Sequence, residues 1–308
     1  METQQENLEM YEEQFKEYVD TETGECIEGI ITPKDEVLES IEAEIRKEKR
    51  ARYYRNKTEF ESYLQCNFGS FYFNNYMELW KKLTKENSAL AFRFLYLCTY
   101  ADFDGYLKFG GTRRGVDTSY MTLKDFKEVF NVSDGMTTKL KNELFDNELI
   151  FQTDDKRLMV NNKYYTRGKL SSTDKRKSTR SFDYGIREIY KKSKPTEHKR
   201  LGLIIPLLDY VNVHLNIICQ NVNEKEPKYM HPLTMEEICD VVGYDYTHST
   251  KLRKTLSKIT VNGQPMVAYM SHQGADFFVI NPAIFYKGKK LDELKTLVNL
   301  FKVNNYSR

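Results

Sequence analysis

The sequence predicts a mostly helical α+β protein in which one helix–helix–hairpin unit occurs twice. Two observations lead to this prediction. Residues 121–144 and 233–256 align over 24 positions without a gap, and they end in closely similar octets, TTKLKNEL and STKLRKTL. Each segment is followed by two short apolar runs separated by a polar tip, which is typical of a β-hairpin.

The two aligned segments share six identical residues and the same spacing of apolar positions. The identical pairs are Thr122/Thr234, Val129/Val241, Thr138/Thr250, Lys139/Lys251, Leu140/Leu252 and Leu144/Leu256. The matching apolar pairs are Leu123/Met235, Phe126/Ile238 and Phe130/Val242. Because spacings of three and four follow one helix face, the two segments are predicted to fold alike. Eight additional residues precede the next matching block of the second copy, and we expect them in a loop.

The first helix of each copy has signals at both ends. Thr122 and Thr234 are candidate N-cap residues, and each is followed three positions later by an acidic residue, as in a capping box. Asn131 and Gly243 stand where the apolar spacing stops, and both residue types are common just after a helix. A short helix is therefore expected between each pair.

A second helix and a hairpin follow in each copy after a turn of five or six residues. The second helices are expected at 137–147 and 249–258. The strands are expected at 149–152 and 158–160 in the first copy, and at 265–270 and 277–280 in the second. The leucines of the two octets recur four residues apart, so we expect them to point into the core.

Helix, helix and hairpin in this order make a winged helix, and the chain is predicted to hold two in tandem. This plan resembles the tandem winged-helix replication initiators of bacterial plasmids and phages. The second copy closes with NPAIFYKG at 281–288 and is similar there to small replication proteins of Firmicute plasmids. The first copy has NNKYY at 161–165 instead and departs from that pattern. The resemblance implies DNA binding, in replication initiation or, as in winged-helix regulators, in transcription.

The domain organisation follows from the repeat and from shifts in composition. The predicted parts are an acidic, flexible head (1–33), a helical and aromatic segment (34–87), a first winged-helix domain (88–170), a basic linker (171–200), a second winged-helix domain (201–290) and a C-terminal helix or tail (291–308). The helix expected from residue 34 is basic in its C-terminal half, which fits either a solvated surface or a phosphate contact.

Charge is distributed unevenly along the chain. The net charge of the 308 residues is +2, yet residues 1–50 carry sixteen acidic and six basic residues, which leaves +12 for the rest. A basic body with an acidic head indicates a polyanionic partner, for which the head would compete. The alternative is a solvated acidic tail that takes no part in binding.

The residues expected to contact DNA lie on the second helices and in the basic linker. They are Thr137, Thr138, Lys139, Lys141 and Asn142 in the first copy, His248, Ser249, Thr250, Lys251, Arg253 and Lys254 in the second, and Lys175, Arg176, Lys177 and Arg180 in the linker. The N-terminal part of such a helix faces base edges in the major groove, where Lys and Arg pair with guanine and Asn with adenine. The alternative is that these polar residues solvate a surface helix.

The sequence gives no signal for an enzyme. The five cysteines are scattered and the five histidines are isolated, so neither a metal site nor the histidine pair of a rolling-circle nickase is indicated. No phosphate-binding or hydrolase motif occurs. We therefore expect a DNA-binding protein without catalytic residues, metal or cofactor. A winged-helix module that binds only proteins is the alternative.

The expected location and partners follow from the same composition. The acidic N-terminal residues lack the apolar stretch of a signal peptide, and no apolar run is long enough to cross a bilayer. We expect a cytoplasmic, nucleoid-associated protein that binds double-stranded DNA and no membrane. Host replication or transcription proteins and further copies of the chain are additional expected partners.

Overall fold

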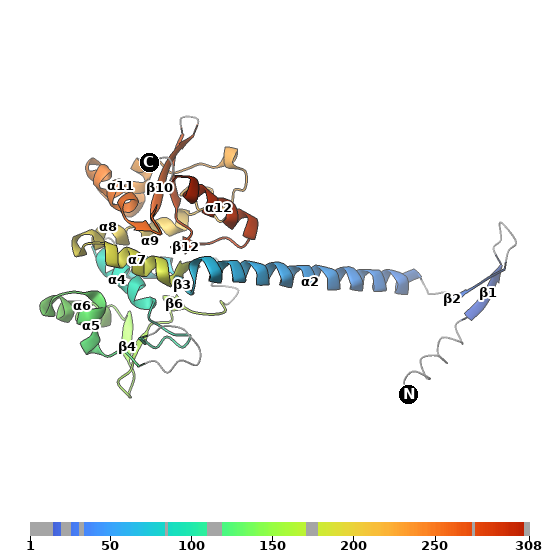
Figure 1. Ribbon diagram of the computed structural model, residues 1–308, viewed down its shortest axis with the longest axis horizontal. Coiled ribbons are helices and arrows are strands. Elements are labelled where there is room, and N and C mark those ends of the chain that lie inside the picture. The colour runs from blue at the N-terminus through green and yellow to red at the C-terminus, as the bar shows by residue number, and fades with distance from the viewer. Residues whose placement is uncertain are drawn as a thin grey trace. The chain divides into compact units, whose positions relative to one another are not determined.

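The computed structural model describes residues 15–19, 26–30, 34–83, 86–109, 119–170, 178–272 and 275–304 (Figure 1). Its elements are α-helices, short 3₁₀ helices and small antiparallel sheets, so the predicted α+β class is confirmed. The chain divides into two units, Met1–Glu59 and Phe60–Arg308, and each is described by itself.

The first unit contains a hairpin and most of a long helix. Strands β1 (Phe15–Val19) and β2 (Cys26–Ile30) pair antiparallel, so the predicted head is not wholly irregular. Helix α2 (Lys34–Phe68) follows and continues into the second unit. From residue 41 to residue 59 every side chain of α2 is exposed. This part of the helix therefore has no buried face within its own unit.

A four-stranded antiparallel sheet lies at the centre of the second unit. Its order is β12 (Phe285–Tyr286), β7 (Ser178–Phe182), β3 (Phe71–Asn75) and β6 (Tyr165–Thr166). The two inner strands pair with Tyr72 opposite Ser181. Each outer strand closes one copy of the repeat, so the two copies meet in a single sheet.

Each inner strand of the sheet is followed by α-helices. After β3 come α3 (Tyr76–Leu83) and α4 (Ser88–Cys98), and after β7 come α7 (Asp183–Lys192), α8 (His198–Gly202) and α9 (Ile204–Leu207). Helices α4 and α8 touch backbone to backbone. A Cβ added to Gly202 would lie 1.8 Å from the carbonyl oxygen of Ser88, and the Ser88 hydroxyl donates to the carbonyl of Lys199 at 2.9 Å. Glycine at 202 therefore permits the close approach of the two halves.

The two helix–helix–hairpin segments come next in each half. The first contains the 3₁₀ turn η1 (Leu123–Asp125), α5 (Phe126–Phe130), α6 (Asp134–Asp146), β4 (Ile150–Gln152) and β5 (Leu158–Val160). The helices of the second segment are α10 (Met235–Val242), the 3₁₀ turn η6 (Tyr246–His248) and α11 (Ser249–Lys258). Its strands are β8 (Thr260–Val261), β9 (Gln264–Pro265), β10 (Val267–His272) and β11 (Ala275–Ile280). Helix α12 (Leu291–Asn304) follows β12.

The predicted helix ends are confirmed. The Thr122 amide donates to the Asp125 carboxylate at 2.6 Å, and the Thr234 amide donates to the Glu237 carboxylate at 2.8 Å. Asn131 and Gly243 follow the first helices with left-handed φ values of 50° and 60°. Equivalent local chemistry thus begins and ends the first helix of both copies.

Each hairpin gains a third short strand segment from the chain before the first helix. The Leu107 amide donates to the Leu158 carbonyl, and the Ile218 amide donates to the Phe278 carbonyl, both at 2.9 Å. The additional residues of the second copy form the β8–β9 hairpin and longer β10 and β11 strands, not only a loop. The repeat therefore runs from β3 to β6 and from β7 to β12, beyond the segments that match in sequence.

The predicted basic linker is wrong over residues 178–200, and residues 171–177 lie outside the described part of the chain. This stretch forms β7, α7 and the start of α8, and Ile186 and Ile189 are fully buried. The predicted boundaries at 88, 171, 201 and 291 do not separate domains, because Phe60–Arg308 is one unit with one continuous core. The many basic residues of this stretch indicated a linker, but α7 is amphipathic and its apolar face packs against the core.

The ends of β6 and β12 place a basic residue at the start of a helix in the other half. Arg167 donates to both carboxylate oxygens of Asp183, the first residue of α7, at 3.1 and 3.0 Å. Lys287 donates to the hydroxyl of Tyr76, the first residue of α3, at 3.1 Å. These reciprocal contacts join the two halves of the repeat.

Candidate nucleic-acid interface

The second helices of the two copies, α6 and α11, have a buried leucine face and an exposed polar face. Leu140 and Leu144 on α6 and Leu252 on α11 are fully buried. Leu256 on α11 is buried with 5% exposure. The predicted inward direction of all four leucines is confirmed. Because they lie four residues apart, they share one helix face, and Thr255 is buried beside Leu252 and Leu256.

The exposed face of α11 is strongly basic. His248, Thr250, Lys251, Arg253 and Lys254 are exposed, and Ser249 is half-buried. The helix has four basic residues, with Lys258 as the fourth, and no acidic residue. All six residues that the sequence nominated in this copy therefore have accessible side chains, five of them on α11 and His248 at the end of η6.

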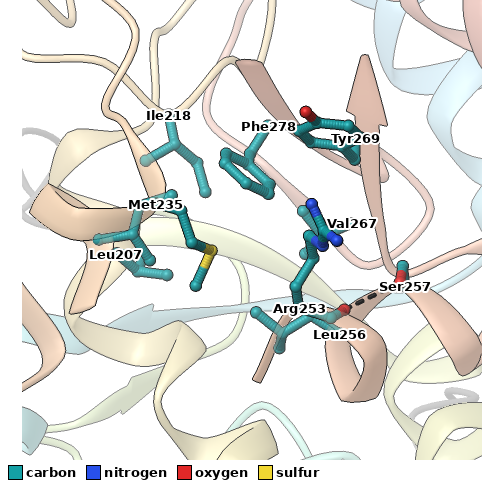
Figure 2. Close-up of a pocket in the computed structure, with 10 residues that line it drawn as sticks. Leu207, Ile218, Met235, Arg253, Leu256, Ser257, Val267, Tyr269 and Phe278 are labelled. Carbon is teal, nitrogen blue, oxygen red and sulfur yellow. Dashed lines mark hydrogen bonds between the residues drawn. The ribbon is translucent and has the colours of Figure 1, made fainter. Parts of the chain in front are cut away.

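Arg253 lies between the helix and the hairpin of the second copy. Its guanidinium carbon is 5.2 Å from the centre of the Tyr269 ring on β10, a distance typical of a cation–π contact. Figure 2 shows Arg253 beside Val267 and Tyr269, over an apolar hollow that includes Phe278. The Ser257 hydroxyl donates to the Arg253 carbonyl at 2.8 Å. The ring contact limits the side-chain conformations of Arg253, and the residue stays exposed.

A shallow hollow runs along the other side of α11. It is lined by Lys251, Lys254 and Lys258 together with Glu197, Thr247, His248, Thr250 and Thr255. The lysine spacings of three and four residues place the three ammonium groups along one side of the helix. Sequence reasoning did not include Lys258 or Tyr269, although the continued lysine spacing was a signal for the first.

The corresponding face of α6 is weaker in charge. Thr138, Lys139 and Asn142 are exposed, and Lys141 is half-buried. The helix carries the acidic residues Asp134, Glu143 and Asp146 against Lys139 and Lys141. The Lys139 ammonium lies 3.7 Å from the Glu143 carboxylate, which partly neutralises it. Helix α6 therefore attracts a polyanion less strongly than α11.

Thr137 was nominated as a contact residue, and this prediction is wrong. Its side chain is buried, at 5% exposure, and its hydroxyl donates to the Ser133 carbonyl at 2.9 Å. Helix α6 begins at Asp134, three residues earlier than predicted, because Ser133 accepts from the Met136 amide as N-cap. Thr137 lies three residues before Leu140 and seven before Leu144, so it shares their buried helix face.

Arg180 is likewise not available for a surface contact. Its guanidinium donates to the Gly288 carbonyl at 2.7 Å and lies 5.4 to 5.8 Å from the centres of the Phe60, Phe71 and Phe73 rings. Burial lowers the pKa of Arg180 to about 10. The other nominated residues of this stretch, Lys175, Arg176 and Lys177, lie outside the described residues.

Comparisons with family models, with curated proteins and with solved structures return no match for this chain. The described residues contain no group of three or more His, Cys, Asp and Glu side chains placed to hold a metal ion. Within the same part of the chain, every helix is too short or too polar to cross a membrane.

Proposed function

We propose that the chain is a sequence-specific double-stranded DNA-binding protein of a bacterial mobile element, a phage or a plasmid, and that it acts as a replication initiator or a transcriptional regulator. The two helix–helix–hairpin segments are proposed to be winged helices. The observation that carries this proposal is the exposed polar face of α11, the second helix of a repeated unit, on which every charged residue is basic. In winged and related helix-turn-helix folds that helix enters the major groove.

Each exposed group of α11 has a role that its chemistry suits. The fork of Arg253 pairs with guanine O6 and N7, and its contact with Tyr269 restricts its orientation. Lys251 and Lys254 serve base edges or phosphates, and Lys258 extends the row toward the backbone of the duplex. On α6, Thr138, Lys139 and Asn142 also contact the DNA, and the acidic residues of this helix weaken its electrostatic attraction to phosphates.

One chain holds both second helices in a single unit, and we propose that one chain contacts two half-sites. The two helices differ where they would meet bases, with Lys141 against Arg253 and Asn142 against Lys254. The two half-sites are therefore expected to differ in sequence. Two major-groove faces on one side of a duplex lie about 34 Å apart.

Binding to random duplex DNA should depend steeply on salt. With about six phosphate contacts, the logarithm of the association constant should fall against the logarithm of salt concentration with a slope of about −5. Fluorescence anisotropy at salt concentrations from about 50 to about 300 mM measures this slope for the full chain, because counterion release dominates the salt dependence in this range. A flat response, or no binding at the lowest salt, would contradict the proposal.

Replacing Arg253 by alanine should weaken binding to a selected site by about 1–3 kcal/mol and relax base preference in one half-site. Lys139→Ala should cost less, because Glu143 already partly neutralises that lysine. Lys302→Ala on α12, another exposed residue, serves as the control. Selection of binding sites followed by titration measures both effects. A result in which Lys139 matters and Arg253 does not would contradict the assignment of α11 as the stronger reader.

The acidic residues of α6 favour a second candidate, in which one or both copies contact proteins and not DNA. Three acidic residues on that helix would repel phosphates and suit a basic protein surface. A flat salt response on DNA, combined with unchanged binding of Arg253→Ala to a protein partner, would support this alternative.

A further inference from the structure

The middle of helix α2 carries a dense run of basic residues. Between positions 46 and 57 there are seven basic residues and one acidic residue, Glu48; the basic ones are Arg46, Lys47, Lys49, Arg50, Arg52, Arg55 and Lys57. All side chains in this range are exposed, and the rings of Tyr53 and Tyr54 are each 63% exposed. None of this surface is used by the proposed function.

This part of α2 lacks an apolar face. Apart from the two tyrosines, the only apolar side chain between positions 46 and 57 is Ala51. A helix that lies in a lipid surface, or in a hydrophobic groove of another protein, needs an apolar stripe opposite its charged face. The composition therefore argues against both of these partners and in favour of a hydrophilic polyanion.

The basic residues repel one another in the folded helix. Lys49, Arg52 and Arg55 succeed each other at intervals of three, and neighbours at this spacing with like charge destabilise a helix by about 0.2–0.5 kcal/mol per pair. Arg46 forms an ion pair with Glu42 at 3.1 Å. Among the residues that the structure describes, none forms an ion pair with Lys47, Lys49, Arg50, Arg52 or Arg55. A polyanion would relieve this repulsion.

We propose that residues 46–57 of α2 bind the phosphates of duplex DNA without reading its sequence. A continuous helix of basic residues fits the major groove of B-form DNA, as basic-region helices do, with contacts to phosphates on both sides. The major groove of A-form RNA is too narrow for this, so DNA is the favoured occupant. The contact adds to the proposed function but does not depend on it, because it rests on charge alone.

The test compares two full-length variants that lose the same charge from different helices. The first carries Lys47→Gln, Lys49→Gln, Arg50→Gln and Arg52→Gln. The matched control carries Lys289→Gln, Lys290→Gln, Lys295→Gln and Lys302→Gln, all exposed residues at or near α12. Glutamine keeps a helix propensity close to that of lysine and arginine, and circular dichroism checks that both variants remain helical.

The salt dependence of binding to random duplex DNA decides the outcome. The α2 variant should lose about 3–4 from the magnitude of the salt slope, since each lost phosphate contact removes about 0.9, and the contacts of α2 make the wild-type slope steeper by this amount than the repeat alone would. The control should change it by less than about 1. Equal slopes for the two variants would overturn the inference. Binding of polyglutamate, with no loss of DNA affinity in the α2 variant, would assign the helix to an acidic protein and overturn it as well.

The same measurements separate this inference from the proposed function. If the α2 variant loses salt slope while Arg253→Ala leaves base preference unchanged, the phosphate contact stands and the reading by α11 fails. If Arg253→Ala relaxes base preference while the α2 variant behaves like its control, the reverse holds.

Discussion

Replacing Arg167 by methionine is expected to lower the free energy of unfolding by about 3–5 kcal/mol, because it leaves a buried carboxylate without its partner. Arg167 is 6% exposed and donates to both carboxylate oxygens of Asp183. It also donates to the carbonyls of Phe71 and Ala101, at 2.9 and 3.1 Å. Burial raises the pKa of Asp183, which opposes the attraction of Arg167. Urea unfolding at neutral pH measures the loss.

Lys287→Met, at the equivalent position of the other half, is the matched control. Lys287 donates to the Tyr76 hydroxyl, and burial lowers the pKa of its ammonium to about 8. Its removal relieves a desolvated charge, so the expected loss is below about 1.5 kcal/mol. The double variant Arg167→Met, Asp183→Leu should recover most of the loss of the single variant. Equal losses at positions 167 and 287, or no recovery in the double variant, would contradict this account of the pair.

Acidification from pH 6.5 to pH 4 should remove about 3 kcal/mol of stability through His198 alone. Burial, and then the positive charge of Arg93, lower the pKa of His198 from 6.5 to about 4. The ring is 2% exposed and packs against Phe92 and Tyr190, with centroid distances of 5.3 and 4.7 Å. The unfolded chain binds a proton at this histidine below pH 6.5, whereas the folded chain does so only near pH 4. Stability is therefore full above pH 6.5 and falls as the pH decreases through this window.

The measurement for His198 is a difference between two chains, because carboxylates titrate in the same range. In the wild type the Arg93 Nε donates to the His198 Nδ1 at 3.3 Å, and His198→Gln retains an acceptor for that donor. The variant should be less stable at pH 7 but should lose about 3 kcal/mol less than the wild type between pH 6.5 and pH 4. Parallel stability curves for the two chains would show that His198 is not buried in its neutral form.

Short-range chemistry accounts for the parts of the fold that could be predicted from the sequence. Thr122 and Thr234 begin helices because an acidic side chain three residues later reaches back to their amides. Asn131 and Gly243 end those helices because they tolerate left-handed backbone angles. The strands of the first hairpin pair as expected, with Phe151 opposite Met159. Each of these features depends on residues close together in the chain.

The errors in the candidate site have physical causes of two kinds. Thr137 was misplaced because it lies three residues before Leu140 and seven before Leu144, a spacing that puts it on their buried helix face. Arg180 was misjudged because an arginine in a basic run looks solvated, yet its stem and guanidinium pack against three phenylalanine rings. The exposed α11 face was predicted because its leucine spacing and basic residues lie within one helix.

By itself, the sequence of this protein determined the two repeated segments, their helix ends, their hairpins and the polar face of each second helix. Only the tertiary structure decided that the basic stretch after residue 177 is a strand and a buried helix, and that β3, β6, β7 and β12 form one sheet. Strands of two to five residues carry too few side chains to specify a partner more than 90 residues away. Their pairing follows from burial of a shared core, which depends on the whole chain.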